Sequence, residues 1–588
     1  MPGVFGALGS AAVLRGFMDF VDVSRGSEIV CHDYSGVLVG FQQFLPESVS
    51  SYEMKSIKLI LHSSIRLSDY ALQSLISAYL KGLDEFLRVI RENLRSDFCL
   101  LLHDVPRKRL FILSDPLGIR KIYFLNAGNS ILFSSSLPHL ALSLVEIFKQ
   151  KLSDSIDVKQ VQELLFKGYT TNKTIFKGLR LLRPGYIHCF NAIGIHSLKS
   201  SYISCSELRS NFESSLEHVH HLMVESIKYM LKRSEGVSLL LSGGIDSSLI
   251  ASLAMRHIPH TKIEPFSLQY KYYSEIDRIK RITEYLKFEK LKVLDVPCDP
   301  HFLLHIFTQS VKMLDEPNLR GAFLLRYFAL NNIRKTGSKE VATGDGCDEI
   351  FCGYWPNYWT FNADMKLNLL RKLPIGVLRI TGLYSPSNLL SRIASDAYFY
   401  KSALLSNLIR EHFSIDPRFG FFVDDEQLIE GFPWRRDFIG EIQKTLYNAL
   451  VKTDILYCEN FAERLGINIV FPYAYRPLIE YVLSLPSSYK IKDEYTKFIL
   501  RVMAIRYNYL PSEILMVEKT GFHQKPIDSI LHGYLLKHIT DGIDRIGEPK
   551  LIALLNKTFR MLNKRNTGSV ISFAGLITWV QGLKERIE

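Results

Sequence analysis

Cysteine is scarce in this sequence, and its spacing does not suggest metal or disulfide chemistry. Eight cysteines are scattered along 588 residues, and no two have CxxC spacing. A disulfide framework and a zinc site are therefore poorly supported. Reduced thiols in a cytoplasmic protein are the simplest interpretation. The cysteines stand at positions 31, 99, 189, 205, 298, 347, 352 and 458.

Long apolar runs are also absent. No segment approaches the length and purity of a membrane-spanning helix. The first 14 residues are apolar and rich in small side chains, but no basic region precedes them, and Arg15 follows the apolar run. They predict a buried strand and turn rather than a signal peptide. We therefore expect a cytoplasmic protein with no membrane partner.

Dense basic runs are missing as well, although the chain carries a formal charge of +12. Such a charge is compatible with nucleic acid, an anionic surface or an acidic partner. The basic residues are dispersed, so a solvated basic surface is the simpler interpretation. A nucleic-acid partner is not expected.

The composition, 47% hydrophobic and 22% charged residues, is that of an ordinary globular protein, and the length predicts two or more domains. In the first two hundred residues, turn signals separate short strands, and one amphipathic helix interrupts them. This pattern predicts an α+β layered sandwich. The strands are expected at 110–113, 121–124 and 131–133, and the helix at 69–93.

After a polar stretch at 197–207, helices alternate with apolar strands, which predicts a doubly wound parallel sheet. Beyond residue 354 the pattern becomes mostly helical. We expect one domain at residues 1–200 and a second at 208–588. The second begins with helices at 216–232, 247–257 and 278–286 and strands at 237–241, 262–268 and 292–296.

The strongest local signal follows the apolar run at 239–241 and has the context strand, turn, helix. Glycines in such a turn let the backbone approach an anion, and the helix N-terminus holds negative charge. Three serines can add hydroxyl donors, and Asp246 can hold Mg²⁺ beside phosphates. No Gly-Lys-Ser/Thr ends the turn, which excludes a Walker loop and leaves a plain serine-capped turn as the alternative. The heptad is Ser242-Gly243-Gly244-Ile245-Asp246-Ser247-Ser248.

This heptad resembles the PP-loop of ATP pyrophosphatases, which cleave ATP to AMP and pyrophosphate. Further motifs resemble, in order, those of asparagine synthetases. In the second half they are Asp315-Glu316-Pro317, Thr343-Gly344-Asp345-Gly346-Cys347-Asp348-Glu349, Thr496-Lys497-Phe498-Ile499-Leu500-Arg501 and Glu518-Lys519-Thr520-Gly521-Phe522. In the first half they are Arg95-Ser96-Asp97-Phe98, Asp115-Pro116-Leu117-Gly118-Ile119-Arg120-Lys121 and Arg183-Pro184-Gly185.

The resemblance covers nearly the whole chain. It implies a glutaminase-like α+β sandwich of the Ntn type, followed by an α/β doubly wound PP-loop ATP pyrophosphatase domain with a helical C-terminal region. ATP and Mg²⁺ are the expected cofactors.

The motif residues also suggest individual roles. Adenylation places a carboxylate near a triphosphate, and Asp246 and Asp348 are the natural pair for the neutralising metal. Lys519 is expected to stabilise developing charge at the phosphate and the acyl centre, and Lys497 to do so for pyrophosphate. Asp345 is either a general base for the incoming amine or a helix N-cap, and both roles remain open.

Two departures from the family pattern stand out. Glutamine-dependent members begin, after Met removal, with a nucleophilic cysteine, whereas the second residue here is Pro2. The Asn-Gly-Glu element that clamps glutamine is also missing before Tyr70, although Asp97 remains. We therefore expect the glutaminase half to be an inactive scaffold.

The second departure lies on the acceptor side. Asparagine-forming members usually carry Arg-x-Pro-Phe-Leu-Asp, and Val470 and Tyr475 here replace its arginine and aspartate. The loss of this charge pair argues against aspartate as the substrate.

Three functions remain open. The first is a synthetase that adenylates a small-molecule or peptide carboxylate and passes it to ammonia, or to a substrate amine as lasso-peptide cyclases and β-lactam synthetases do. The second is a PP-loop enzyme acting on tRNA, and the third is a non-catalytic paralogue. The intact loop, Asp348 and Lys519 favour the first. A homodimer, or a complex with biosynthetic partner proteins, is compatible with it.

Overall fold

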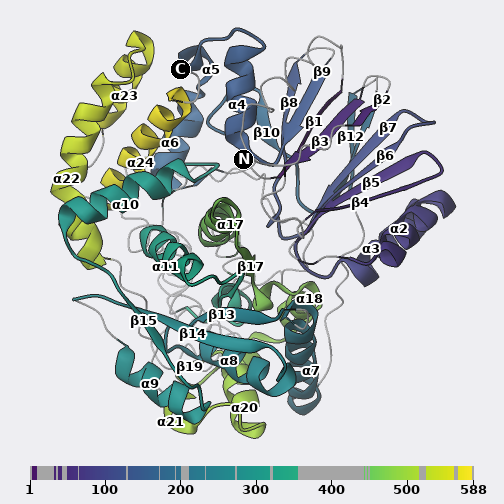
Figure 1. Ribbon diagram of the computed structural model, residues 1–588, viewed down its shortest axis with the longest axis vertical. Helices are drawn as coiled ribbons and strands as arrows, with labels where there is room; N and C mark the ends of the chain where they lie inside the picture. The colour runs from purple at the N-terminus through teal and green to yellow at the C-terminus, as the bar shows by residue number, and fades with distance from the viewer. Residues whose placement is uncertain are drawn as a thin grey trace, which may run out of the picture.

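In the residues that it describes, the computed structural model contains two antiparallel sheets, one five-stranded parallel sheet and a two-stranded ribbon, surrounded by helices (Figure 1). The residues that the structure describes are 3–8, 32–34, 37–42, 49–63, 65, 67–127, 130–167, 169–170, 173–191, 194–199, 211–231, 234–271, 275–317, 319, 322–354, 443, 447, 450–515, 525–561 and 567–585.

The first half of the chain folds as a sandwich of two six-stranded antiparallel sheets, which confirms the α+β expectation. One sheet has the order β10-β8-β9-β1-β3-β2 and the other β12-β11-β7-β6-β5-β4. The first comprises β1 (Gly3–Leu8), β2 (His32–Tyr34), β3 (Val37–Gln42), β8 (Tyr123–Ala127), β9 (Ser130–Ser134) and β10 (Leu179–Leu181). The second comprises β4 (Val49–Met54), β5 (Ile57–His62), β6 (Cys99–Asp104), β7 (Arg109–Ser114), β11 (Tyr186–Asn191) and β12 (Gly194–Lys199).

Side chains of β6 point alternately to the two faces of their sheet, because successive residues of a strand do so. Leu101 packs in the core between the sheets with Ile112 and Phe133. Leu100 and Leu102 belong instead to a second core under two helices. The strand is therefore buried on both faces, which explains its continuous apolar sequence.

Those two helices correct one expectation. The sequence predicts a single helix at 69–93, but the chain forms α2 (Asp69–Lys81) and α3 (Leu83–Asn93). Gly82 separates them with φ +138°, a backbone conformation that interrupts a helix and that glycine adopts without steric cost. The described residues of this half form three further helices: α4 (Leu137–Glu146), α5 (Leu152–Ser155) and α6 (Val158–Lys167).

The second half contains the expected doubly wound parallel sheet, with the order β15-β14-β13-β16-β17. Its strands are β13 (Gly236–Leu240), β14 (Lys262–Gln269), β15 (Lys292–Asp295), β16 (Glu340–Ala342) and β17 (Asn468–Val470). Its helices include α7 (Phe212–Leu231), α8 (Ile245–His257), α9 (Ile276–Tyr285), α10 (Pro300–Lys312) and α11 (Phe323–Lys335). The strand order reverses between β13 and β16. Ligands of such sheets bind at the carboxyl ends of the strands beside this point.

The described remainder of the second half is mostly helical, as expected. It comprises α12 (Cys347–Ile350), α17 (Asp454–Leu465), η2 (Pro472–Ala474), α18 (Arg476–Ser484), α19 (Ser487–Lys490), α20 (Phe498–Arg506), α21 (Ser512–Leu515), α22 (Lys525–Asp544), α23 (Pro549–Met561) and α24 (Thr567–Lys584), with a ribbon of β18 (Ile491–Lys492) and β19 (Tyr495–Thr496).

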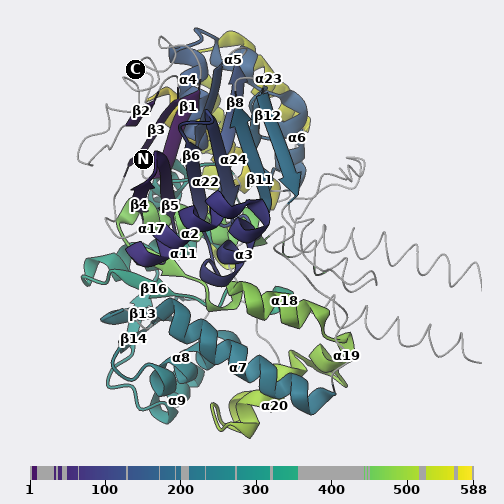
Figure 2. The same ribbon diagram turned by 90° about the vertical axis from the view of Figure 1, so that its right-hand side faces the viewer.

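The last helices return to the first half of the chain. Figures 1 and 2 show α22 to α24 beside α5 and α6, above the parallel sheet. On α24, the Trp579 ring lies 5.9 Å from that of Phe176, and its Nε1 donates to the carbonyl of Leu314 at 2.9 Å. The chain end therefore packs against both halves. The expected domain change between 200 and 208 lies outside the described residues.

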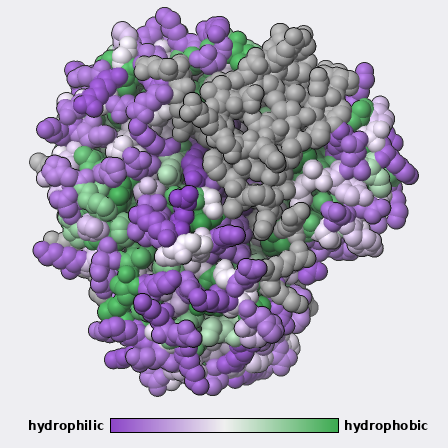
Figure 3. All heavy atoms as spheres, viewed as in Figure 1, coloured by the Kyte–Doolittle hydropathy of each residue, from purple (hydrophilic) through white to green (hydrophobic). Residues whose placement is uncertain are grey.

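No helix within the described ranges is long and apolar enough to cross a membrane. On the face shown in Figure 3, hydrophilic side chains predominate and hydrophobic ones are scattered between them.

Candidate active site

The serine- and glycine-rich turn joins the carboxyl end of β13 to the start of α8. Gly243 has φ +77°, and a Cβ there would come within 3.2 Å of the Ile279 side chain. Gly244 is the N-cap of α8 and supplies no capping side chain. Amide groups of the first turn of a helix have no partner within the helix, so this turn can bind an anion.

The three serines of this turn are not equivalent. The hydroxyls of Ser242 and Ser247 lie 3.2 Å apart, and the amide of Ser242 donates to Ser247 Oγ at 3.2 Å. Ser248 is fully buried and donates to the carbonyl of Gly244 at 2.7 Å. Its hydroxyl therefore stabilises the first turn of α8, whereas the sequence suggested a phosphate donor.

A second loop follows the neighbouring strand, β16. A Cβ at Gly344 would lie 3.1 Å from both the Asp246 Cβ and the Ser247 amide nitrogen. Gly346 has φ +93° and is the N-cap of α12. These two glycines let the second loop lie directly against the first.

This approach brings together two carboxylates that are about a hundred residues apart in sequence. The ammonium of Lys497 lies 2.5 and 2.7 Å from the two carboxylate oxygens of Asp246, and 2.6 Å from Oδ1 of Asp348. The lysine side chain is only 2% exposed. Burial by itself lowers the pKa of Lys497, but attraction by Asp246 and Asp348 outweighs it and raises the pKa above its ordinary value.

The donor set suits a hard divalent cation. Three carboxylate oxygens converge on one point where a positive charge already sits, and Mg²⁺ prefers oxygen ligands. In the part of the chain that the structure describes, no group of three or more His, Cys, Asp or Glu side chains could hold a metal. A magnesium ion held by Asp246 and Asp348 would therefore complete its shell with phosphate oxygens and water, as it commonly does.

Asp345 lies in the same loop and is held by Arg326 of α11. The guanidinium donates from Nη1 and Nη2 to the two carboxylate oxygens, at 2.8 and 2.7 Å. Thr343 Oγ1 donates to the same carboxylate at 2.8 Å. The N-cap of α12 is Gly346, so Asp345 does not have the N-cap role that the sequence left open.

Arg326 is the residue that sequence reasoning missed. It also donates from Nε to Asp454, the first residue of α17, at 3.1 Å. Burial by itself lowers its pKa, but Asp345 and Asp454 are among the groups whose attraction raises it well above the ordinary value. It stands within a helix and in no motif, so only its spatial contacts identify it.

The aromatic run after β17 makes one contact that supports the site and one with the first half of the chain. Tyr473 Oη donates to the carbonyl of Asp246 at 3.1 Å, which braces the start of α8. Tyr475 accepts a hydrogen bond from Arg95 Nη1 of the first half, at 3.1 Å. Tyr475 is fully buried. The tyrosine in the family's aspartate position thus joins the two halves.

Lys519 and Pro2 lie outside the described residues, so their expected roles rest on the sequence alone.

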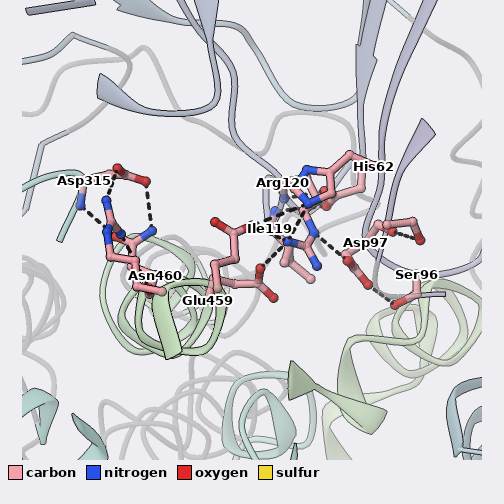
Figure 4. Close-up of polar contacts among 12 residues, drawn as sticks. His62, Ser96, Asp97, Ile119, Arg120, Asp315, Glu459 and Asn460 are labelled. Carbon is pink, nitrogen blue, oxygen red and sulfur yellow. Dashed lines mark hydrogen bonds and ion pairs between the residues drawn. The ribbon is translucent and has the colours of Figure 1, made fainter. Parts of the chain in front are cut away.

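Asp97, the remaining residue of the expected glutamine site, is occupied by an internal partner. Figure 4 shows Arg120 between Asp97 and helix α17. Its guanidinium lies 2.8 Å from Asp97 Oδ2, 2.7 Å from Glu459 and 2.8 Å from Glu463. The side chains of Arg120 and Asp97 are 6% and 5% exposed. This ion cluster connects the sandwich to the helical region.

The Asp315-Glu316 motif lies at the same interface, next to α17. Asp315 accepts from Asn460 at 2.9 Å and from Ser136 at 3.0 Å. Glu316 accepts from Thr170 at 2.6 Å and lies 3.2 Å from the ammonium of Lys452. These carboxylates therefore bind the first half to the second.

The comparisons with known proteins follow the same division. Residues 218–579 match the family described as asparagine synthase, and residues 75–203 match the glutamine amidotransferase domain. A putative glutamine-hydrolyzing asparagine synthetase of Mycobacterium bovis is 26% identical over 286 residues, which cover 47% of this chain and 42% of that protein. Glutamine-hydrolyzing asparagine synthetase 1 of Bacillus subtilis is 20% identical over 453 residues, covering 73% and 68%.

The chain thus spans less than half the length of the mycobacterial relative. Among solved structures, the glutamine phosphoribosylpyrophosphate amidotransferase of Bacillus subtilis aligns with 10% identity and a TM-score of 0.23, covering 58% of this chain and 81% of that one. That similarity is too low to add to the assignment.

Proposed function

The chain belongs to the asparagine synthase family, and we propose that it is an ATP-dependent synthetase that forms an amide through an acyl-adenylate. The observation that supports this most is the convergence of Asp246 and Asp348 on one cation, beside a turn suited to phosphate. We further propose that residues 1–200 and 208–588 are its two domains, with this site in the second.

In the proposed reaction, the turn at 242–248 binds the triphosphate through its backbone amides and the start of α8. Magnesium, when held by Asp246 and Asp348, supplies positive charge beside the phosphates. An oxygen of the substrate carboxylate attacks the α-phosphorus, and pyrophosphate leaves. A nitrogen nucleophile then attacks the acyl carbon, loses a proton and displaces AMP, which keeps one oxygen of the original carboxylate.

Asp345 and Lys519 complete the proposed machinery. Because two hydrogen bonds from Arg326 fix the orientation of Asp345, its carboxylate is placed to attract a protonated amine or to accept its proton. Lys519 is proposed, on its sequence motif, to stabilise charge that develops on the phosphate and acyl oxygens.

The nitrogen source is proposed to be ammonia or a substrate amine. Pro2 has no nucleophilic side chain, and the Asp97 carboxylate is already ion-paired with buried Arg120. Both features disfavour glutamine hydrolysis. We expect ammonium or an amine substrate, but not glutamine, to sustain turnover by the purified chain. Release of glutamate from glutamine, coupled to turnover, would contradict this.

The carboxylate is proposed to belong to a small molecule or peptide other than aspartate. Val470 and Tyr475 stand where asparagine-forming members carry a charge pair, and Tyr475 faces Arg95 of the first half. A macrolactam- or β-lactam-forming activity, in which the amine belongs to the same substrate, fits this substitution as a second version of the same chemistry.

The test of this proposal is pyrophosphate release from Mg·ATP in the presence of candidate carboxylates. We expect Asp246→Ala to abolish release, because the proposed metal then loses one of its two carboxylate ligands. Asp541→Asn, which changes an exposed carboxylate on α22, is the matched control and should leave the rate unchanged. Unchanged release by Asp246→Ala would show that the nucleotide site lies elsewhere.

A further inference from the structure

The position of the Lys497 ammonium coincides with the position proposed for the metal. Its nitrogen lies 2.5 to 2.7 Å from three carboxylate oxygens of Asp246 and Asp348. An ammonium and a magnesium ion cannot share this point, because both are cations that need the same oxygens. Lys497 and the metal are therefore alternatives at one position.

A glycine leaves the space that the Lys497 side chain occupies beside Asp348. A Cβ at Gly353 would lie 1.9 Å from Asp348 Oδ1 and 2.3 Å from the Lys497 Cε, so any larger residue there would displace one of the two. Lys497 also has φ +54° at the N-cap of α20. A left-handed backbone at a residue other than glycine is energetically unfavourable and persists only where surrounding contacts impose it.

The charges explain why a cation must be present before the nucleotide arrives. Two carboxylates that converge on one point repel each other, and in a buried setting this repulsion is only weakly screened. A single ammonium offsets half of their charge. A divalent metal offsets all of it, but it gains the most when phosphate oxygens complete its shell.

We propose that Lys497 is an exchangeable internal cation that occupies the metal position until Mg·ATP binds and its ammonium moves aside. This inference rests on the proposed function for the identity of the nucleotide. The lysine has four methylene groups, so its ammonium can move without its backbone. The consequence is that metal and nucleotide enter together, and metal alone is excluded.

The test is a titration of the nucleotide-free protein with Mn²⁺, followed by the electron paramagnetic resonance signal of free Mn²⁺. We expect Lys497→Met and Lys497→Gln to bind one Mn²⁺ at least tenfold more tightly than the wild type, because the competing charge is gone. Lys492→Met removes an exposed lysine five residues earlier and should bind as the wild type does. Adding Asp348→Asn to Lys497→Met should abolish this tighter Mn²⁺ binding, which would show that the ion is held by Asp246 and Asp348.

Equal or weaker Mn²⁺ binding by the folded Lys497 variants would overturn the proposal, since Lys497 would then be a permanent part of the site. If neither Lys497→Met nor Lys497→Gln unfolds cooperatively, the Mn²⁺ titration of the wild type tests the proposal instead. Stoichiometric Mn²⁺ binding without nucleotide that is lost in Asp348→Asn overturns the exchange, and binding seen only with a non-hydrolysable ATP analogue supports it. The titration needs no turnover, so its result is independent of the pyrophosphate-release assay. Failure of the exchange proposal can therefore be distinguished from failure of the proposed function.

Discussion

At the scale of single residues, the carboxylate proposed to face the amine is held in place by Arg326. This guanidinium donates two hydrogen bonds to Asp345, from Nη1 and Nη2, and a third to Asp454 from Nε. Lysine offers a single ammonium and cannot reproduce such a fork. The orientation of Asp345, a loop residue, is therefore set by a residue of helix α11.

We predict that Arg326→Lys lowers kcat by on the order of a hundredfold, because a misplaced catalytic group can cost that much. The KM for ATP should change little, since Arg326 donates hydrogen bonds to Asp345, Asp454 and Cys458, and none of these lies in the turn at 242–248. Steady-state kinetics with ATP and amine varied separately measure this split. The control is Arg334→Lys, an exposed arginine on the same helix. An equal fall in kcat/KM for ATP and for the amine, with a raised KM for ATP, would indicate general damage to the fold and contradict the prediction.

Lys519 carries a second prediction at this scale. A fixed cation that acts on developing charge lowers the barrier more than it strengthens binding. Lys519→Ala should therefore reduce product formation about a hundred- to a thousandfold while ATP still binds. Equilibrium binding of an ATP analogue, measured beside product formation, separates the two effects. Normal turnover by Lys519→Ala would remove this residue from the mechanism.

The sequence motifs identify Asp246, Asp348 and Lys497 as residues of one site, and the structure brings these three together. They do not reveal that Lys497 lies on the carboxylates, because a motif gives no direction to a side chain. The motifs fail to identify Arg326 for a different reason. Its partner is 19 residues further along the chain, in a loop after another strand, so no local pattern connects them.

At the scale of elements, α17 links the two halves of the chain. Its first residue, Asp454, contacts Arg326 beside the site, and Glu459 and Glu463 further along contact Arg120 of the sandwich. Burial raises the pKa of both glutamates, and the attraction of Arg120 opposes that rise. Without Arg120, three carboxylates would share a buried interface.

We predict that Arg120→Met destabilises the protein by about 3–5 kcal/mol, the usual cost of removing one partner from a buried ion pair. The midpoint of urea unfolding measures the change. Arg88→Met, which breaks exposed ion pairs on α3, should shift the midpoint little. If Arg120→Met unfolds at the wild-type midpoint, the ion cluster does not hold the halves together.

Sequence periodicity locates most elements but not their interruptions. The strands and helices around the turn at 242–248 lie where the alternation of apolar residues places them. The helix expected at 69–93 is divided, because its apolar spacing continues through Gly82 while the backbone there turns to φ +138°. Periodicity reports which side chains are buried, whereas a single φ angle decides whether the helix continues.

At the scale of the whole molecule, the proposed site lies where the strand order of the parallel sheet reverses. The loops after β13 and β16 meet there because these parallel strands are neighbours. The sequence predicts this sheet, since helices and strands alternate along it. It does not predict that α24 returns to pack on Phe176, or that Asp315 and Glu316 bind the sandwich, because long-range packing leaves no local signature.

The central claim, adenylation of a carboxylate, is tested most directly by following oxygen from the substrate. Candidate carboxylates labelled with ¹⁸O are incubated with the protein, Mg·ATP and an amine, and the AMP is examined by mass spectrometry. The account predicts that one labelled oxygen appears in AMP and that pyrophosphate exchanges into ATP only when the carboxylate is present. Formation of ADP and phosphate, with the label in phosphate, would contradict it.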